Sequence, residues 1–550
     1  MIGVISRGNE AQIVHEFFQL FKTPWEFYTS GKKYDVVIST VDNTPAVMTK
    51  LLIIYNSNET NDDLVRGIIP LSKHRNVCLE NGGLSVPIYG NALSFKGTSR
   101  PLLTIKNSTA VSAIEIDGSH ETILRIGYDL FQEVGFLLCK GQPIENAYIP
   151  TLDMHIMILR EWIINCGIRL IEIPAVPAGY DFMVCLTHDV DFVKIRHHRF
   201  DHTMWGFLYR STFGSFFDLL MGKISLSRFL RNWKAVLLLP FVHLGLAQDF
   251  WLNFEKYLAV EKGLSSTFFF IPFKNRSGDK VPMPNPERRA TRYDIRDVRD
   301  WARVLLEKGY EIGVHGIDGW HNSKKGREEF HQIAEITGVR KLGVRMHWLC
   351  FDSNSPKSIE DAGYSYDSTC GYNNTVGYLN GTLQVYRPIG TLQLLEIPMH
   401  IQDSALFNPA YLGWTENQAW SLCNTLIKNA SIYGGVLTIL WHHRSLAPER
   451  LWGDFYVRLL GELKAHRTWF GTAMQVVEWF QKRREISFKA VSRTDDLLRL
   501  TLECEDNDRG SELVFRVHIP QSSENTSHSD KHTYIDVPWN GQDQIEIPLR

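Results

Sequence analysis

Five apolar runs in the middle of the chain each end in acidic, basic or imidazole side chains. The residues at these ends are His188, Asp189 and Asp191; His315, Asp318 and His321; Arg345 and His347; His400 and Asp403; and His442 and His443. A solvated loop also collects such residues, but their recurrence at the ends of so many apolar runs favours one shared site.

This set of side chains could carry out the hydrolysis of an amide or an ester. Two histidines and one carboxylate are a common ligand set for a divalent ion that keeps positions open for water. Such an ion lowers the pKa of its water to about 7 and polarises a carbonyl group. A second carboxylate could accept the proton of the water, and a separate histidine could protonate the leaving nitrogen.

Segments of strand type and helix type alternate between about residues 180 and 485, and they would position these side chains. We expect strands at 182–186, 266–271, 310–314, 341–344, 394–398 and 435–441. We expect helices at 250–261, 295–308, 324–337, 355–362, 415–431 and 452–465. This alternation predicts a parallel sheet or barrel, in which catalytic side chains gather at the carboxyl ends of the strands.

The polar ends of these runs resemble, in chain order, the motifs of the polysaccharide deacetylase (NodB-homology) family. Residues 187–191, Thr-His-Asp-Val-Asp, are similar to the first motif, Thr-Phe-Asp-Asp, and residues 311–321 to the second, His-Ser/Thr-x-x-His. Residues 343–345 resemble the start of the third motif, residues 440–442 the fifth, Leu-x-His, and Asp403 falls where the acid of the fourth is expected. The sequences of these motifs are closer to those of a cytoplasmic-looking branch of the family, in which an α/β segment precedes the barrel.

The resemblance implies a distorted (β/α) barrel of seven or eight strands that removes an acyl group, N-acetyl first, from a sugar or glycan precursor. It implies that Asp189 is the general base, held ionised by a bidentate pair with Arg345. His442 would be the general acid, oriented by Asp403. The implied ligands of a divalent metal ion, with zinc as the first choice, are Asp191, His315 and His321.

Two departures from the family pattern leave alternatives open. The adjacent Asp-Asp pair is replaced by Asp189-Val-Asp191, so either aspartate could be the base while the other binds the metal. His315 and His321 are six residues apart instead of four, so a loop must intervene, and Asp318 is an alternative ligand.

The other histidines are expected to have supporting roles. His443 competes with His442 for the role of the acid, and the Leu-x-His register favours His442. His188, His347 and His400 are predicted to line the pocket or support the ligands. Each acidic residue at a strand end also has a purely structural interpretation, because Asp often caps helices and turns.

The flanking regions differ in pattern from the middle of the chain. Residues 1–150 are expected to form a small α/β domain of unknown role, with strands at 35–39 and 51–55 and a helix at 123–138. The barrel would occupy 151–485. Residues 486–550 are expected to form a small all-β domain, with strands at 486–493, 497–503, 513–519, 534–537 and 544–547.

Composition excludes several classes of protein and site. The net charge of −2 over 550 residues gives no general attraction to nucleic acid. The eight cysteines form no CxxC pair, which argues against a thiolate zinc site. No apolar stretch reaches the ~18 residues of a membrane-spanning helix, and the first residues lack the pattern of a signal peptide, so we expect a cytoplasmic protein.

Residues 213–246 mix basic side chains with many Leu, Phe and Trp residues. This mixture is compatible with peripheral membrane contact through an amphipathic helix, or with a helical insertion packed on the barrel. Two other functions compete with the deacetylase: a metal-independent amidohydrolase acting on another carbon–nitrogen bond, and a barrel that binds a glycan without catalysis. The oligomeric state is open.

Overall fold

The computed structural model describes residues 1–96, 100–118, 121–280, 286–494, 497–504, 512–520 and 533–548. The middle of the chain forms a nine-stranded sheet in which all paired strands run parallel. Its strands are β11 (Phe182–Val190), β12 (Ser266–Phe270), β13 (Glu311–Gly316), β14 (Val344–Met346), β15 (Tyr366–Asp367), β16 (Leu395–Glu396), β17 (Ile401–Gln402), β18 (Val436–Leu440) and β19 (Thr468–Phe470).

The strands are ordered β16-β15-β14-β13-β12-β11-β18-β17, and β19 pairs with β11. Every residue of β11 is buried, as expected for a parallel strand covered on both faces. The predicted mixed α/β fold with a parallel sheet is confirmed. Among the described residues no ladder joins β16 to β17, so closure into a barrel of seven or eight strands stays a prediction.

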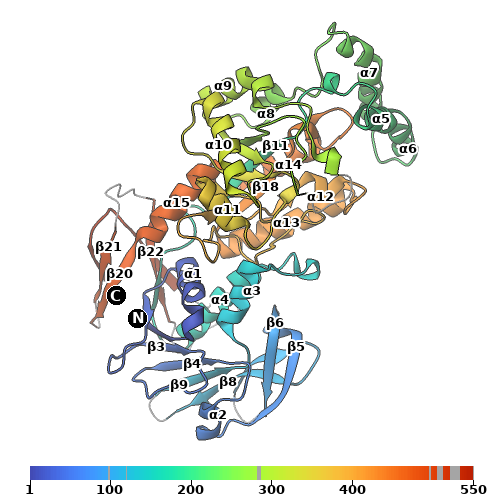
Figure 1. The fold of residues 1–550 in the computed structure, drawn as a ribbon. Helices are drawn as coiled ribbons and strands as arrows, with labels where there is room; N and C mark the ends of the chain where they lie inside the picture. The colour runs from blue at the N-terminus through green and yellow to red at the C-terminus, as the bar shows by residue number, and fades with distance from the viewer. Residues whose placement is uncertain are drawn as a thin grey trace.

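Helices connect these strands and supply the rest of the central core (Figure 1). They are α8 (Phe254–Val260), α9 (Arg299–Glu307), α10 (Ser323–Thr337), α11 (Ser355–Ala362), α12 (Asp403–Phe407), α13 (Glu416–Tyr433), α14 (Gly453–Ala465) and α15 (Ala473–Glu485). Local sequence sets their ends: Asn322 caps the start of α10, and Gly338 ends it in a left-handed conformation.

Between β11 and β12 the chain leaves the central sheet and forms a group of protruding helices (Figure 1). These are α5 (His202–Tyr209), a π-helical segment (Arg210–Gly214), α6 (Ser215–Leu220) and α7 (Leu226–His243). No helix in the described part of the chain is long and apolar enough to cross a membrane.

The N-terminal part contains a second nine-stranded sheet, parallel on one side and antiparallel on the other, in the order β2-β1-β3-β4-β9-β8-β6-β5-β7. Its strands are β1 (Ile2–Ile5), β2 (Trp25–Phe27), β3 (Val36–Ser39), β4 (Leu51–Tyr55), β5 (Pro70–Asn81), β6 (Leu84–Phe95), β7 (Arg100–Ile105), β8 (Val111–Asp117) and β9 (Thr122–Ile126). Its helices are α1 (Ala11–Phe21), α2 (Asn61–Val65), α3 (Leu130–Cys139) and α4 (Thr151–Asn165).

The prediction of one helix over 123–138 is wrong, because the segment is a strand followed by a helix. β9 lies between β4 and β8, and α3 begins only after Asp129, whose carboxylate accepts a hydrogen bond from the backbone of Gln132. Between the two elements, a Cβ on Gly127 would lie 2.0 Å from the carbonyl oxygen of Leu93. The glycine therefore lets the chain pass close to β6 where a helix was expected.

The last strands form two antiparallel three-stranded sheets, β20-β21-β24 and β10-β22-β23. They comprise β20 (Ser487–Arg493), β21 (Leu497–Glu503), β22 (Val514–Ile519), β23 (Thr533–Pro538) and β24 (Gln544–Pro548), together with β10 (Leu170–Glu172). The five strands predicted after residue 485 are confirmed to within one residue. The partnership with β10 was not predicted, because antiparallel pairing across more than 300 residues leaves no local signal.

Buried charges join α15 to the N-terminal part. Arg484 donates hydrogen bonds of 2.9 and 2.6 Å to the two carboxylate oxygens of Glu16 in α1. The guanidinium of Arg483, which is 2% exposed, donates to the carbonyl oxygens of Gln19, Leu20, Ile173 and Pro174. Arg483 thus connects α1, the segment after β10 and α15.

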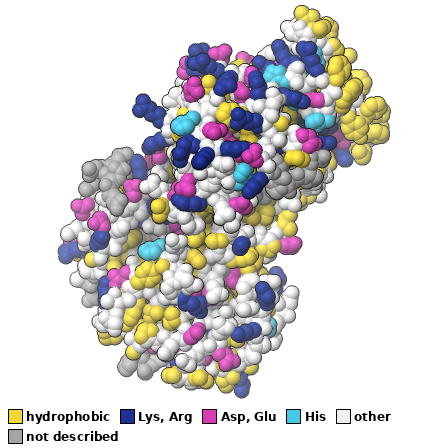
Figure 2. All heavy atoms as spheres, in the orientation of Figure 1, with side chains coloured by type: hydrophobic (Ala, Val, Ile, Leu, Met, Phe, Trp, Pro, Cys, Tyr) yellow, Lys and Arg dark blue, Asp and Glu magenta, His cyan; other side chains and the backbone are white. Residues whose placement is uncertain are grey.

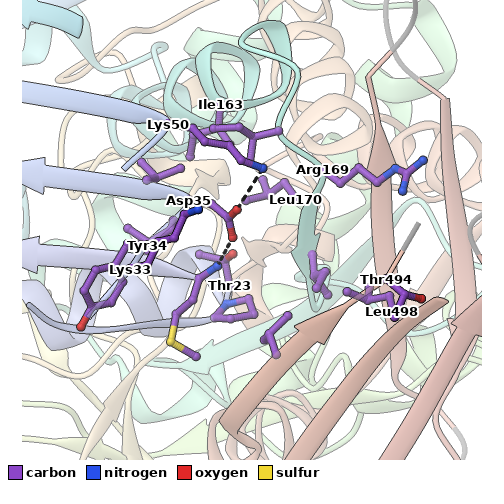
Figure 3. A pocket seen from close by; sticks show the side chains of 17 residues that line it. Thr23, Lys33, Tyr34, Asp35, Lys50, Ile163, Arg169, Leu170, Thr494 and Leu498 are labelled. Atoms are coloured by element: carbon purple, nitrogen blue, oxygen red, sulfur yellow. Dashed lines mark hydrogen bonds and ion pairs between the residues drawn. The ribbon is translucent and has the colours of Figure 1, made fainter. Parts of the chain in front are cut away.

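A pocket of about 500 Å³ lies between the N-terminal sheet and the C-terminal strands (Figure 3). Lys50 and the amino group of Met1 both contact the carboxylate of Asp35, and Arg169 and Thr494 lie across the opening. None of the residues singled out as chemically active in the sequence lines this pocket. The candidate site lies elsewhere, in the parallel sheet.

Candidate active site

A cavity of about 380 Å³ opens at the carboxyl ends of the parallel strands. Both aspartates of the first motif line it, together with a histidine from each of three later strand ends. The lining residues are Asp189, Asp191, Arg288, His315, His347, Trp348, Leu349, Asn373, Gln402, Ser404, Asn408, Tyr411, Leu440 and His442. An adjoining cavity of about 120 Å³ shares Asp189, Asp191 and His442.

Three of these residues could hold a metal ion. One ligand atom each from Asp191, His315 and His347 can be chosen so that all three lie within 4.8 Å of one another. Asp191 directly follows β11, His315 lies on β13, and His347 directly follows β14. Parallel strands of one sheet therefore deliver the three side chains to the same edge of it.

The hydrogen bonds of this group suit a ligand set. His315 Nδ1 lies 2.9 Å from the carbonyl oxygen of Arg345, which can only accept, so Nδ1 carries the proton and the Nε2 lone pair is free. This Nε2 lies 3.1 Å from Asp191 Oδ1, and His347 Nε2 lies 3.4 Å from the same oxygen. Burial lowers the pKa of His347 well below its ordinary value, which favours the neutral imidazole that binds metals.

The carboxylate of this group is also in the form that binds metals. Burial alone would raise the pKa of Asp191, but the facing imidazoles of His347 and His315, together with the protonated His442, outweigh it and hold the pKa well below its ordinary value. Two imidazoles and an ionised carboxylate match the donor set of open divalent sites. The residues present therefore fit a divalent ion.

The structure does not bring His321 into this group. Its Nε2 lies 3.1 Å from Asp318 Oδ1, and neither residue lines the cavity. Asp318 instead accepts a hydrogen bond from the backbone N–H of Asp279 and forms an ion pair with Lys325. His321 and the alternative ligand Asp318 therefore form a separate polar pair, because the loop after β13 turns away from the cavity.

His347 stands where His321 was expected, and a sequence signal for it exists. Side chains two residues apart on an extended strand point to the same side. Arg345 lies on β14 and His347 directly after it, so both are directed toward Asp189 and Asp191. The same spacing of two places both aspartates on one cavity.

Asp189 is held by a buried guanidinium. Nη1 of Arg345 lies 3.0 Å from Asp189 Oδ1 and 2.7 Å from the hydroxyl of Thr187. The remaining nitrogens donate to the backbone and hydroxyl oxygens of Ser368, at 2.9 and 2.8 Å. The expected bidentate pair is therefore a single contact, because Ser368 takes the other donors.

His442 is held in the same way by a buried carboxylate. Its Nδ1 lies 2.6 Å from Asp403 Oδ1, and its backbone N–H donates to Asp403 Oδ2 at 2.7 Å. Burial opposes protonation of His442, but Asp403 with Asp191 and Asp189 outweighs it and raises the pKa to about 9. The Nε2 is left facing Asp191, 3.7 Å away. The side chain can therefore offer a proton to the cavity at neutral pH.

The other candidate histidines lie outside the two cavities. His443 is fully buried, accepts the backbone N–H of Asn253 on Nε2, and has its pKa lowered to about 3 by burial. His188 lies 2.9 Å from buried Glu261, and His400 bonds to the backbone of Thr382 and of Thr438. All three are committed to partners inside the protein.

The cavity wall contains an unusual backbone segment. Trp348 and Leu349 follow His347 directly and both have positive φ, 63° and 49°. Bulky residues rarely adopt this left-handed conformation, which costs about 1–3 kcal/mol where it persists. Such conformations cluster at functional sites, and here the turn places two large side chains against the cavity.

No family model matches the chain, and no curated protein matches it. A solved structure described as a polysaccharide deacetylase from Mycobacterium smegmatis is 18% identical, with a TM-score of 0.36, and the match covers 58% of this chain and 99% of that one. Another so described, from Pseudomonas aeruginosa PAO1, is 13% identical with a TM-score of 0.34, covering 55% and 92%. The Puue allantoinase is 15% identical with a TM-score of 0.32, covering 56% and 92%.

The solved structures that match this chain thus include polysaccharide deacetylases, the family whose motifs the sequence resembles.

Proposed function

We propose that this protein is a metal-dependent hydrolase that removes an acyl group, N-acetyl first, from a sugar or glycan precursor. The observation that carries the proposal is the convergence of three functional units on one cavity. A ligand set, a carboxylate held by an arginine and a histidine held by an aspartate all face the same space. A barrel that only bound a glycan would not need these paired acid and base groups.

The metal ligands in this proposal are Asp191, His315 and His347, with zinc as the first choice. A divalent ion held there would supply Lewis-acid chemistry, which polarises a carbonyl and makes water a better nucleophile. His347 replaces His321 of the motif-based prediction, because only His347 reaches the group.

The remaining side chains would move protons. Asp189, fixed by Arg345, would accept a proton from the attacking water. His442 would donate its Nε2 proton to the leaving nitrogen, while its Nδ1 stays on Asp403. We assign Asp191 to the metal and Asp189 to the water, because Asp191 lies with the two imidazoles, whereas Asp189 is the aspartate that Arg345 contacts.

Two aromatic side chains in the cavity support the proposal that the substrate is a carbohydrate. Trp348 and Tyr411 line the cavity beside the proposed ligands. Their rings offer apolar faces with polar edges, which suit the stacking of a sugar ring. The expectation of an acylated glycan precursor came from the motif resemblance, and these two rings add support for it.

Metal content tests the ligand assignment without knowledge of the substrate. After zinc loading and desalting, we expect about one equivalent in the wild type and in His321→Ala, and almost none in His315→Ala or His347→Ala. His321→Ala is the matched control, because it removes the histidine that lies with Asp318. Loss of metal in His321→Ala with retention in His347→Ala would reverse the assignment.

Metal content, combined with an assay of acetate release, separates the competing functions. No metal in the wild type would favour an amidohydrolase that works without one. Bound metal combined with no acetate release from any acetylated oligosaccharide would favour a binding barrel. Acetate release that depends on Asp189 and on the added ion is the result expected from the proposal.

A further inference from the structure

The protruding helices carry an unusual concentration of exposed apolar side chains. Sixteen of the thirty large apolar side chains that are exposed in the described chain lie between Phe200 and Leu246. In Figure 2 they form a yellow area over α5–α7, with basic side chains among them. Scattered exposed apolar residues are normal, but a contiguous patch of this kind marks a binding surface.

One face of α7 accounts for the regular part of this patch. The exposed residues recur every three or four positions, which places them on a single side of the helix. We call this row the apolar stripe; it consists of Leu226, Leu230, Trp233, Leu237, Phe241 and Leu244.

The opposite face of α7 is already packed. Ala235, Leu239 and Val242 are buried and share a core cluster with Phe207 of α5 and with Trp251. The helix therefore has two apolar faces, of which the protein covers only one. The stripe is therefore not the face with which α7 packs on the protein core, because another face of the helix already does so.

Ion pairs hold α7 in place with the stripe outward. Arg228 contacts Asp454 of α14 at 2.6 Å and Glu416 at the start of α13 at 3.0 Å. These two contacts fix the amino end of α7 on the central part. The stripe is thus presented by a helix attached at its start and packed along its inner face.

The basic side chains around the apolar stripe indicate the kind of surface that it binds. Residues 202–246 contain five Lys or Arg and one Asp, whereas the whole chain carries −2. Arg231 and Lys234 are exposed on α7 next to the stripe. Aromatic and aliphatic side chains flanked by basic ones match the interface of an anionic bilayer, where rings lie at the headgroups and cations meet lipid phosphates.

We propose that α5–α7 dock the protein on an anionic membrane surface, with the apolar stripe inserted at the interface. The docked helices would lie beside the catalytic site. Phe192 packs against their core cluster and also lines the smaller cavity that contains Asp189 and His442. The inference does not depend on the proposed hydrolase activity.

Vesicle flotation of the full-length protein tests the proposal. We expect the wild type to float with vesicles of phosphatidylcholine and phosphatidylglycerol, and less with phosphatidylcholine alone. The combined variant Leu230→Ser/Leu237→Ser/Phe241→Ser should lose about a thousandfold in vesicle affinity, because each of the three inserted side chains is worth roughly a tenfold factor. All three positions are exposed, so the fold should not depend on them.

Two further variants make the test specific. Leu392→Ser/Ile432→Ser/Val457→Ser removes three equally exposed apolar side chains elsewhere and should bind vesicles like the wild type. Arg231→Gln/Lys234→Gln should lose about tenfold or more on anionic vesicles only, since each basic residue contributes about 1 kcal/mol there.

Three results would overturn the proposal. The wild type could stay unbound with both kinds of vesicle. The stripe variant could bind as well as the wild type. The stripe variant could also convert a dimer into a monomer, seen by light scattering, in a protein that never floats; the stripe would then be a contact between two copies.

Discussion

At the scale of single residues, the proposed acid and base each depend on one buried partner. Arg345 is fully buried and holds Asp189, while Asp403 is fully buried and holds His442. Neither partner reaches the cavity itself. Their effects should therefore be separable from substrate contact and from metal binding.

Replacing Asp403 should reduce catalysis without loss of metal. In Asp403→Asn, His442 loses the carboxylate that orients Nδ1 and favours its protonated form. We expect acetate release to fall by about 10²–10⁴, the usual worth of a positioned general acid. Zinc content measured on the same sample should equal that of the wild type. Loss of both together would indicate that Asp403 supports the ligand set instead.

The pair of Asp189 and Arg345 should show strong coupling in stability. Arg345→Met leaves a buried carboxylate without a cation, which costs about 3–5 kcal/mol. Adding Asp189→Asn removes that charge, so the double variant should be more stable than Arg345→Met alone. Urea unfolding of the metal-free proteins measures the cycle. Simple additivity of the two changes would contradict a direct interaction.

The sequence allows the site residues at the ends of strands to be predicted, because side chains two positions apart on a strand share a side. Asp189 and Asp191 lie two positions apart and line one cavity, and Arg345 and His347, also two positions apart, contact these two aspartates. The location of His321 could not be predicted, because it depends on the path of a loop. Loop paths are set by contacts such as that of Asp318 with Asp279, which leave no periodic pattern.

At the scale of elements, glycines decide how closely neighbouring strands pack near the site. A Cβ on Gly343, just before β14, would fall 1.9 Å from the ring of Tyr366. That ring is fixed, because its hydroxyl donates to Glu311 at 2.6 Å. β14 and β15 can therefore lie side by side only with glycine at this position.

Gly343→Ala should destabilise the protein and weaken metal binding. Overpacking of a buried site costs about 1–3 kcal/mol, and the displaced strand delivers Arg345 and His347. Gly461→Ala is the control: no atom lies within 4 Å of its added Cβ, and it is inside α14. It should be neutral or stabilising by up to about 1 kcal/mol. Thermal unfolding compares the two; equal effects would remove the packing argument.

Element types followed from local pattern more readily than element partners. Six strands of the parallel sheet and those after residue 485 were predicted from apolar runs, whereas the short strands β15, β17 and β19 were not. The segment 123–138 was mistaken for one helix, since its apolar residues also fit a helical period. Its first part forms strand β9 because it pairs with both β4 and β8. A short stretch of sequence gives no information on such distant contacts.

At the scale of the whole molecule, the N-terminal part and the parallel sheet are joined by buried charges. Glu16 of α1 accepts both guanidinium bonds of Arg484 and also the backbone N–H of Arg387. Lys22 donates to the carbonyl of Arg484 at 2.8 Å. Separation of the parts would exchange these bonds for bonds to water, and a bond to a charged group contributes about 1.5–3 kcal/mol net to the folded state, which favours unfolding as one unit.

The guanidinium of Arg483 has a further consequence for how the chain is held together. It donates to carbonyl oxygens on both sides of the turn at Gly167, so its bonds would survive a cut there. A protease site inserted at Gly167, where the surroundings are open, should give two fragments that elute as one particle. Arg483→Met should loosen that association, and separate elution of fragments with Arg483 intact would show that the contacts are too weak. Covalent continuity after α4 is then dispensable, and the protein could be assembled from two separately made chains.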